Sequence, residues 1–252
     1  MRGSDPRSPS PLRVALVLPA YNEEGNLTPL ITALADVAQR AAFPLRVVVV
    51  NDGSSDGTAG ELAALEARVP ELSVTHHPRN RGMAAALKTG IGVALDLGVD
   101  AMVFMDSDLS HDPDALPVFV DALARGADVV LGSRFVPGGG MVGVPLWRRS
   151  ISRAGNIFGG LVLRMPFGDL TTGYRAIRRQ VFERITLGED GFTIQLESVV
   201  KAYAAGFRVV EVPIVLGTRR HGASHMSYNP QLFRDYWRLL QTCRQWLRQR
   251  HP

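Results

Sequence analysis

Short apolar runs rich in β-branched residues alternate with longer segments of helical periodicity along most of the chain. This alternation is typical of parallel strands joined by crossover helices. Runs such as Val47–Val50 are continuously apolar, as expected for strands buried on both faces of a sheet. The pattern predicts strands at 14–19, 46–52, 72–77, 101–108 and 128–135, and helices at 26–41, 57–69, 82–98 and 113–126. We therefore expect an α/β fold with an open, twisted, mostly parallel sheet flanked by helices.

The expected domain organisation has three parts. The chain of 252 residues, 46% of them hydrophobic, is long enough to bury a large core. Residues 1–13 are rich in Ser, Pro and Arg and lack the apolar core of a secretion signal, which predicts a disordered tail. We expect a single α/β domain at 14–228 and a separate helix at 229–252.

Composition excludes several classes of protein. No window approaches the roughly 18 consecutive apolar residues that a membrane-spanning helix needs. The single cysteine, Cys243, excludes an internal disulfide and fits a reducing, cytoplasmic compartment. The net charge of +4 is uneven, because residues 219–252 carry seven arginines against the single acid Asp235. We expect no nucleic-acid partner.

Polar and acidic residues follow four of the predicted strands at the point where each strand ends. These segments are residues 19–24, 51–56, 106–112 and 133–135. The carboxyl ends of parallel strands share one edge of the sheet, where such folds bind their ligands. Each loop alone would suit a turn, but four acidic or basic loops at one edge predict a ligand site.

The first two loops each permit two interpretations. In the first, Tyr21 and Glu23 would hold a base and a ribose, or Asn26 would cap the following helix with the acids near its positive end. In the second, Asp52 begins a tight turn, and Ser55 or Asp56 can cap the next helix.

The segment FMDSDLSHDP at 104–113 carries three carboxylates. The chain has neither G-x-G-x-x-G after its first strand nor a P-loop, so a nucleotide diphosphate would lack a glycine cradle. A Mg²⁺ or Mn²⁺ ion between Asp108 and the phosphate oxygens would neutralise it instead. A polar turn capping the next helix would look similar, and His111 and Asp112 suit such a turn before Pro113.

Eight motifs stand in the order and spacing of one enzyme family. They are PAYNEEGNL, VVVNDGSSDGT, HHPRNRGMAAALKTGI, FMDSDLSHDP, LGSRF, TTGYRAIRR, GFTIQLE and VVEVPI. Over about residues 14–228 the chain resembles family 2 glycosyltransferases, and within them the dolichol-phosphate (polyprenol-phosphate) mannose synthases. The resemblance implies a GT-A fold, Rossmann-like in its sheet, a nucleotide-sugar donor, a divalent metal and inversion at the anomeric carbon.

The resemblance also implies roles for individual residues. The family's nucleotide-binding positions match Pro19, Tyr21, Glu23 and Asp52. Its metal and diphosphate motif matches Asp106 and Asp108, with Ser107 between them, and Asp108 is the strongest metal-ligand candidate. Its donor-binding arginine matches Arg134, and the arginine that meets the donor phosphates matches Arg219.

Two positions depart from the family pattern. His225 stands where the family has a lysine, so a fixed cation is replaced by a group that is mostly neutral near pH 7. Either His225 works charged, Arg220 compensates, or the donor differs. Ser110 stands where some relatives have a glutamine metal ligand, and the Q-x-x-R-W motif of processive polysaccharide synthases is missing, which argues against polymerisation.

The acceptor decides whether a general base is needed. A hydroxyl acceptor needs a carboxylate beside it, for which Asp169, Asp190 and Glu197 are candidates, whereas a lipid phosphate is already anionic. The resemblance places Gln195 and Glu197 near the acceptor. Alternatively, Glu197 is a helical residue paired with a basic side chain.

Two further segments keep alternative interpretations. The glycine-rich segment 135–145 is either a plain flexible connection or a lid. The helix expected at 229–252 alternates aromatic and arginine residues, so it either lies in an anionic membrane interface or packs on the domain or on a second copy.

The leading hypothesis is a metal-dependent inverting transfer of mannose from GDP-mannose to a polyprenyl phosphate. Asp108, Arg134, Arg219 and Glu197 are the expected catalytic residues, acting at the cytoplasmic membrane face. The alternatives are transfer of a hexose to a soluble acceptor, and a non-catalytic nucleotide-sugar-binding protein.

Overall fold

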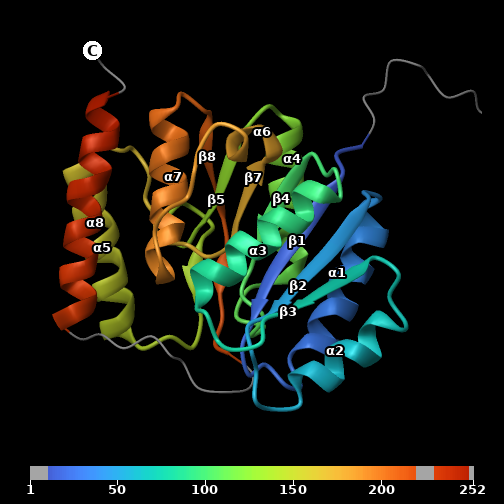
Figure 1. Cartoon of the computed structure of the whole chain (residues 1–252). Helices are drawn as coiled ribbons and strands as arrows, with labels where there is room; N and C mark the ends of the chain where they lie inside the picture. The colour runs from blue at the N-terminus through green and yellow to red at the C-terminus, as the bar shows by residue number, and fades with distance from the viewer. Residues whose placement is uncertain (1–10, 220–229, 250–252) are drawn as a thin grey trace, which may run out of the picture.

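A computed structural model describes residues 11–219 and 230–249. Within them lies a seven-stranded sheet in the order β3-β2-β1-β4-β7-β5-β8 (Figure 1). Strand β7 is antiparallel to both of its neighbours, and the remaining pairs are parallel. The strands are β1 Val14–Ala20, β2 Leu45–Asn51, β3 Leu72–His76, β4 Ala101–Phe104, β5 Val129–Ser133, β7 Arg175–Arg178 and β8 Val209–Pro213.

All five predicted strands are confirmed, although two of them end earlier than predicted. Strand β4 ends at Phe104 rather than at Asp108, because the chain leaves the sheet there and reaches a left-handed residue, Leu109, with φ 62°. Strand β5 likewise ends at Ser133, two residues before the predicted end. Strands β7 and β8 were not predicted, because β7 has only two apolar residues between two arginines and Glu211 interrupts the apolar run of β8.

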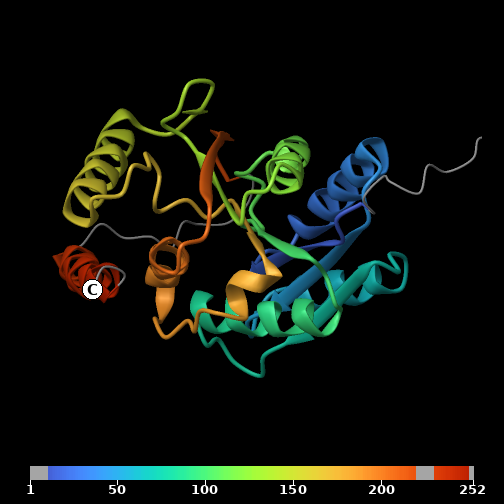
Figure 2. The ribbon, with the colours of Figure 1, turned by 90° about the horizontal axis from the view of Figure 1, so that it is seen from above.

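Helices cover both faces of the sheet (Figure 2). One face packs against α1 Leu27–Ala41, α2 Thr58–Glu66 and α4 Leu116–Ala124. The other packs against α3 Met83–Asp96, α6 Arg179–Phe182 and α7 Ile194–Ala204. The four predicted helices are confirmed, although the fourth begins with a 3₁₀ turn at Pro113–Ala115.

The apolar strands form elements buried on both sides. In β1, Leu16 and Leu18 belong to the core under α1, whereas Ala15 and Val17 belong to the core under α3. All four side chains have no exposed surface. This explains why β1 and β2 read as continuous apolar runs rather than as alternating ones.

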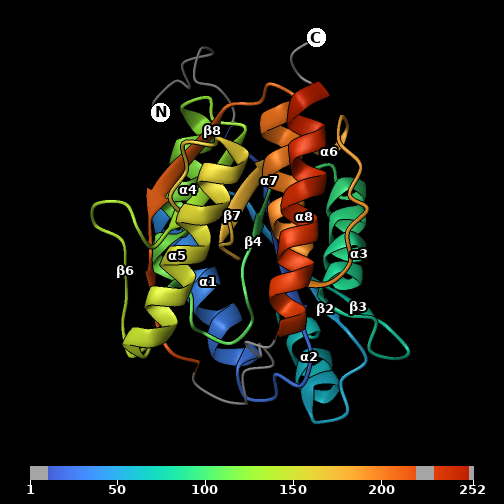
Figure 3. The ribbon, with the colours of Figure 1, turned by 90° about the vertical axis from the view of Figure 1, so that its left-hand side faces the viewer.

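The two remaining helices, α5 and α8, form an outer layer beyond α7 (Figure 3). They are α5 Leu146–Leu163 and α8 Pro230–Gln249, and α8 contacts both α5 and α7. The inner side of α8 buries Leu239, Leu240 and Cys243. Of the described helices, none is both long and apolar enough to cross a membrane.

Candidate active site

The acidic loops meet where β1, β2 and β4 end, because these strands are neighbours in the sheet. Ser107 Oγ donates a hydrogen bond to the Pro19 carbonyl at 2.8 Å, which joins the loop after β4 to the end of β1. Tyr21 follows in the loop after β1 and is half-buried. The register of parallel strands thus places the predicted nucleotide and metal residues at one edge.

Arg219 links two of these loops. Its Nη1 lies 3.2 Å from Glu23 Oε1, and its Nε lies 3.1 Å from Asp108 Oδ2. The second oxygens are also occupied, since Asn26 Nδ2 donates to Glu23 Oε2 at 2.7 Å and the Ser110 amide donates to Asp108 Oδ1 at 2.9 Å. Three predicted site residues therefore form one cluster, defined here as the Glu23–Asp108–Arg219 cluster.

This edge holds more negative charge than its cations neutralise. Burial raises the pKa of Glu23, and the charges of Asp108 and Asp106 raise it further, while Arg219 and the Asn26 hydrogen bond lower it. The pKa of Asp106 is also raised, first because surrounding protein displaces water and then because Asp108 is close. A dication at this point would favour the charged form of both groups.

The pair Asp106 and Asp108 fits a hard divalent cation. No three His, Cys, Asp or Glu side chains converge as a metal-binding group in residues 11–219 and 230–249. Two carboxylates on one loop offer the oxygen donors that Mg²⁺ and Mn²⁺ prefer, and such ions commonly complete their shell with phosphate and water oxygens. Both residues would therefore hold an ion together with a bound diphosphate.

Two residues that were not assigned to the site support Asp106. His111 is buried, with Nδ1 3.4 Å from the Asp106 amide and 3.9 Å from Asp106 Oδ2, and burial lowers the pKa of its imidazole. A side chain at Gly173 would come within 3.3 Å of both carboxylate oxygens of Asp106. His111 thus does more than shape the turn, whereas Asp112 does cap it, accepting from the Asp114 amide at 2.9 Å.

Side chains link the starts of α1 and α2, and Asn26 stands at the N-cap position of α1, as one interpretation of the sequence expected. The Asn26 side chain makes no capping bond and turns to Glu23 instead. Glu61 of α2 accepts from the Gly25 and Thr28 amides at the start of α1. Asp56 accepts from the Thr58 amide at the start of α2, which confirms one of the two alternatives for that loop.

Asp52 organises a neighbouring loop. Its carboxylate contacts His77 Nδ1 at 2.6 Å and accepts from the Arg81 and Gly82 amides at 3.0 and 2.7 Å. His77 in turn lies 3.0 Å from Thr89 Oγ1 of α3. The HHPRNRG segment is part of a motif that carries the family resemblance, but nothing in the sequence pairs His77 with Asp52.

Arg134 lies in a separate pair. Its Nε and Nη2 contact the two oxygens of Asp169 at 2.6 and 2.7 Å, and Asp169 has no exposed surface. Asn156 of α5 supports this pair by bonding to Thr171 Oγ1 at 3.0 Å and to the Leu170 amide at 2.8 Å. Asp169, one of the candidate bases, is therefore the partner of Arg134 in this structure.

The other candidate bases differ from each other. Glu197 is 1% exposed, and its carboxylate accepts from the Gly188 and Glu189 amides and from Lys201 Nζ at 2.7 Å. Glu197 therefore matches the alternative interpretation, a helical residue paired with a basic side chain. Asp190 is almost fully exposed and lies 3.6 Å from Lys88. Gln195, which was expected near the acceptor, accepts a hydrogen bond from Arg175 through its main-chain carbonyl.

The segment that carries Arg219 is tied to the loop after β4. Gly217 donates to the Ser110 carbonyl at 2.8 Å. Just before it, β9 Val215–Leu216 pairs with β6 Gly140–Met141, so the glycine-rich segment 135–145 is anchored rather than a plain flexible connection. Its use as a lid stays a prediction, and His225 and Arg220 lie outside the described residues.

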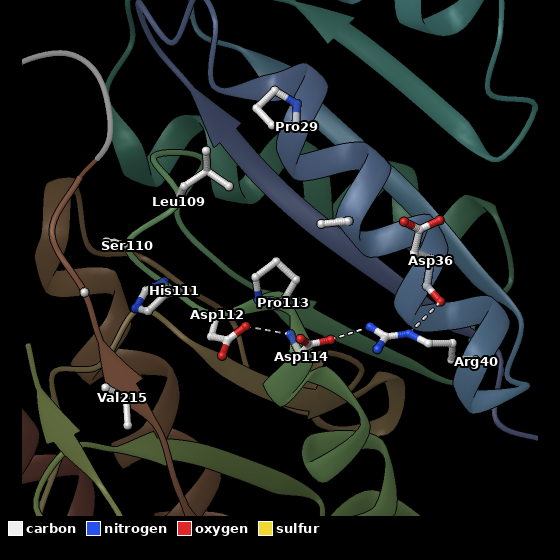
Figure 4. Close-up of a pocket in the computed structure, with 12 residues that line it drawn as sticks. Pro29, Asp36, Arg40, Leu109, Ser110, His111, Asp112, Pro113, Asp114 and Val215 are labelled. Atoms are coloured by element: carbon white, nitrogen blue, oxygen red, sulfur yellow. Dashed lines mark hydrogen bonds and ion pairs between the residues drawn. The ribbon is translucent and has the colours of Figure 1, made fainter.

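A cavity of about 440 Å³ lies beside this site (Figure 4). It runs between α1 and the loop after β4, and its lining includes Pro29, Asp36, Ser110, His111 and Val215. Arg40 pairs with Asp114 across it. Because neither Asp106 nor any member of the Glu23–Asp108–Arg219 cluster lines it, the cavity is distinct from that cluster.

Comparison with known proteins identifies the family and relatives of this chain. The family model "Glycosyl transferase family 2" matches residues 15–186. The chain is 38% identical over 231 residues to the polyprenol monophosphomannose synthase of Mycolicibacterium smegmatis, covering 89% of this chain and 85% of that protein. It is 36% identical over 219 residues to the undecaprenyl-phosphate mannosyltransferase of Micrococcus luteus, covering 86% and 88%.

A solved structure shares the fold. Glucosyl-3-phosphoglycerate synthase from Mycobacterium tuberculosis, in complex with phosphoglyceric acid, superposes with a TM-score of 0.69 at 19% identity, covering 92% of this chain and 80% of that one. The same enzyme has been solved with Mn²⁺ and UDP-glucose, with a TM-score of 0.66. The expected GT-A-like architecture is thereby confirmed.

Proposed function

Because the chain belongs to glycosyltransferase family 2 and its relatives act on polyprenyl phosphates, we propose that it transfers mannose from GDP-mannose to a polyprenyl phosphate. Transfer requires Mg²⁺ or Mn²⁺ and inverts the anomeric carbon. The reaction takes place at the cytoplasmic face of a membrane, where a lipid acceptor is held.

One observation carries the choice of an anionic acceptor. Asp169 and Glu197, two of the three carboxylates considered as a base, are buried and each is held by a cation. The oxygens of both carboxylates are already occupied by donors, so neither is placed beside an acceptor hydroxyl, whereas a phosphate acceptor needs no proton removed before it attacks. This pairing supports a phosphate over a hydroxyl.

The chain's own residues then act mainly by position and charge. Asp106 and Asp108 would hold the divalent ion, which supplies neutralising charge for the diphosphate leaving group when bound. Arg219 stays beside Asp108 and adds a second positive charge there. Pro19, Tyr21, Glu23 and Asp52 line or support the nucleotide end, and Arg134 aligns a phosphate near α5.

The test is a donor and acceptor screen with the purified full chain. GDP-mannose and UDP-glucose are each incubated with a polyprenyl phosphate or with soluble alcohols, with Mn²⁺, with Mg²⁺ or with chelator. Products are identified by mass spectrometry. We expect mannosyl transfer to the phosphate only, and only with metal.

Variants sharpen this screen. Asp108→Asn removes a metal ligand's charge and is expected to abolish transfer, whereas Asp121→Asn, an exposed carboxylate on α4, should retain it. Transfer only to alcohols, with loss in Glu197→Gln, would favour the soluble-acceptor alternative. Donor binding with neither transfer nor hydrolysis would favour a binding protein.

A further inference from the structure

A buried imidazole joins α3 to the loops at the carboxyl edge of the sheet. His77 directly follows β3, and its Nδ1 lies 2.6 Å from Asp52 Oδ1 in the loop after β2. Its Nε2 lies 3.0 Å from Thr89 Oγ1 on α3. The Asp52 amide in turn donates to the Ala20 carbonyl at the end of β1, at 2.8 Å. The contacts therefore run in one line from α3, through His77 and Asp52, to the loop that carries Tyr21.

The two partners of His77 fix the tautomer of its ring. An ionised carboxylate accepts hydrogen bonds and donates none, so Nδ1 is the donor toward Asp52. In the neutral ring Nε2 is then an acceptor, and the Thr89 hydroxyl is the group that donates to it. His77 is 7% exposed and Asp52 is 3% exposed, so water competes little for these bonds. Thr89 thus selects the tautomer that can hold Asp52.

The orientation of the Asp52 carboxylate decides where the loop after β3 lies. Oδ1 also accepts from the Arg81 amide at 3.0 Å, and Oδ2 accepts from the Gly82 amide at 2.7 Å, where α3 begins. In residues 11–219 and 230–249, His77 is the only side chain that bonds to this carboxylate. Without His77 the carboxylate could turn about its Cβ–Cγ bond, and both backbone amides would lose their acceptor.

The loop after β3 also packs tightly on the loop after β2. Gly53 has a φ of 69°, and a Cβ added to it would overlap the backbone of Arg79 and Asn80. Beside Gly53, Ser54 Oγ accepts from the Asn22 amide of the loop after β1 at 3.0 Å. Because backbone touches backbone at Gly53, a shift of the loop after β3 would be passed on to both neighbouring loops.

We propose that His77 is a positioning residue of the donor site, which fixes the Asp52 carboxylate and, through it, the loops that receive the nucleoside diphosphate of the donor. The proposal rests on the proposed function, which gives Asp52 a place at the nucleotide end. His77 acts through Asp52 rather than by touching the reacting atoms. Its removal should therefore weaken binding of the nucleotide and leave the rate of the saturated enzyme nearly unchanged.

The experiment is calorimetric titration of the full chain with GDP in the presence of Mn²⁺. His77→Phe keeps a ring and loses both nitrogens. In His77→Asn the amide nitrogen stands near the place of Nδ1, whereas in His77→Gln it stands near the place of Nε2. We expect the Kd for GDP to rise about tenfold or more in His77→Phe and His77→Gln, and to return to within about threefold of the unchanged chain in His77→Asn.

Steady-state kinetics with GDP-mannose give a second readout. The KM for the donor should follow the same order of variants, while kcat stays within about twofold of the unchanged chain. A histidine that served stability alone would not separate KM from kcat in this way.

Two matched controls accompany these variants. His76→Phe changes the neighbouring imidazole, which is exposed and contacts Asn51 rather than Asp52, so GDP should bind as to the unchanged chain. Thr89→Val removes the hydroxyl with little change of shape and should raise the Kd about threefold, whereas Thr89→Ser should not raise it. Thermal unfolding checks that each variant folds, and the Thr89 pair carries the test if His77→Phe does not.

Three results would overturn the positioning role. The first is a folded His77→Phe variant that binds GDP as tightly as the unchanged chain. The second is equal affinity in His77→Asn and His77→Gln, which would remove the contact at Nδ1 as the cause. The third is a loss of affinity that follows the loss in unfolding temperature from variant to variant, which would assign His77 to stability.

Binding and transfer together separate this proposal from the proposed function. GDP affinity that depends on His77, in a chain without transfer activity, refutes the proposed function and leaves the positioning role standing. Mannosyl transfer with unchanged GDP affinity in His77→Phe refutes the positioning role alone. UDP is titrated in parallel, and if UDP binds instead of GDP, the proposed donor is wrong and the variants are compared with UDP. A chain that binds neither nucleotide refutes both proposals.

Discussion

Asp52, Asp169 and Glu197 are acidic residues whose carboxylates already have partners. Asp52 holds the loop at Arg81 and Gly82, Asp169 holds Arg134, and Glu197 holds Lys201 and two backbone amides. Glu23 and Asp108 instead share a single guanidinium with each other. Because one guanidinium is shared between two carboxylates and Asp106 lies close to both, the excess negative charge of the site lies at Glu23, Asp106 and Asp108.

The variant Glu197→Gln should be less stable than the unchanged chain. The change removes a buried charge that three donors face, so the free energy of unfolding should fall by roughly 3 to 5 kcal/mol. Denaturant unfolding measures this. Glu183→Gln is the matched control, because Glu183 forms an exposed pair of the same spacing with Arg179. Its loss should cost less than about 1 kcal/mol. A stable Glu197→Gln variant that lost transfer would instead assign it to the chemistry.

Arg219→Ala should act on the donor. Removing the guanidinium leaves the diphosphate and the carboxylates short of one positive charge, so kcat/KM for the donor should fall about a hundredfold. Arg219→Lys keeps the charge but loses the two-pronged contact, and should recover part of the activity. Arg125→Ala, at an exposed position just after α4, is the control. Unchanged steady-state kinetics in Arg219→Ala would remove this residue from the site.

At the scale of elements, the size of single side chains sets how closely a helix can pack on the sheet. Gly90 lets α3 approach β1 closely, because a side chain there would meet Val17 directly and would lie 3.4 Å from Val50. Gly92 in the same helix faces open space, with no atom within 4 Å of an added Cβ. Glu61 of α2 accepts from the Gly25 amide before α1, and Glu24 accepts from the Gly57 amide before α2, so side chains also join the starts of these two helices.

The two glycines of α3 should respond to alanine in opposite ways. Gly90→Ala forces the helix off the sheet and should lower the free energy of unfolding by about 1 to 3 kcal/mol. Gly92→Ala adds no clash and gains helix propensity, so it should raise the same quantity by up to about 1 kcal/mol. Thermal or denaturant unfolding of both variants measures the difference. Equal effects would contradict the close packing of α3 on Val17.

At the scale of the whole molecule, charge is divided between two regions. Negative charge gathers at the carboxyl edge of the sheet, around Glu23, Asp106 and Asp108. Positive charge gathers on α5 and α8. Such a separation means that cationic and anionic ligands would be attracted to different parts of the molecule.

The carboxyl edge should make stability depend on pH and on metal. The folded-state pKa of Glu23 is raised, so its contribution is present at low pH and is lost as pH rises through that pKa. Without metal, the free energy of unfolding of the unchanged chain should fall relative to Glu23→Gln over the range above the ordinary carboxyl pKa. Mn²⁺ should reduce this fall, because it offsets the charges of Asp106 and Asp108.

Denaturant unfolding across pH, with and without Mn²⁺, measures both effects without any assay of transfer. Asp121→Asn, far from the edge on α4, should keep the pH dependence of the unchanged chain. A difference between the unchanged chain and Glu23→Gln that does not vary with pH would contradict the raised pKa. Identical curves with and without Mn²⁺ would argue against an ion at this edge.

The sequence by itself determined the layering, the five predicted strands and the edge at which acidic loops meet. These features follow from the periodicity of apolar residues and from the positions where strands end, both of which can be read from short stretches of sequence. Glu23 and Asp108 could be grouped before the structure because each lies in a loop that follows a predicted strand, whereas Arg219 was assigned only through the family resemblance. Their proximity is a property of parallel strand order.

The tertiary structure alone decided the partners of those residues. Asp52 with His77, Arg134 with Asp169, and α1 with Glu61 are pairs between segments far apart in sequence. It also decided that β7 enters antiparallel between β4 and β5, and that α5 exposes its apolar side. An amphipathic period shows that a helix has two faces. Which face is outward depends on long-range packing, and no local pattern contains that information.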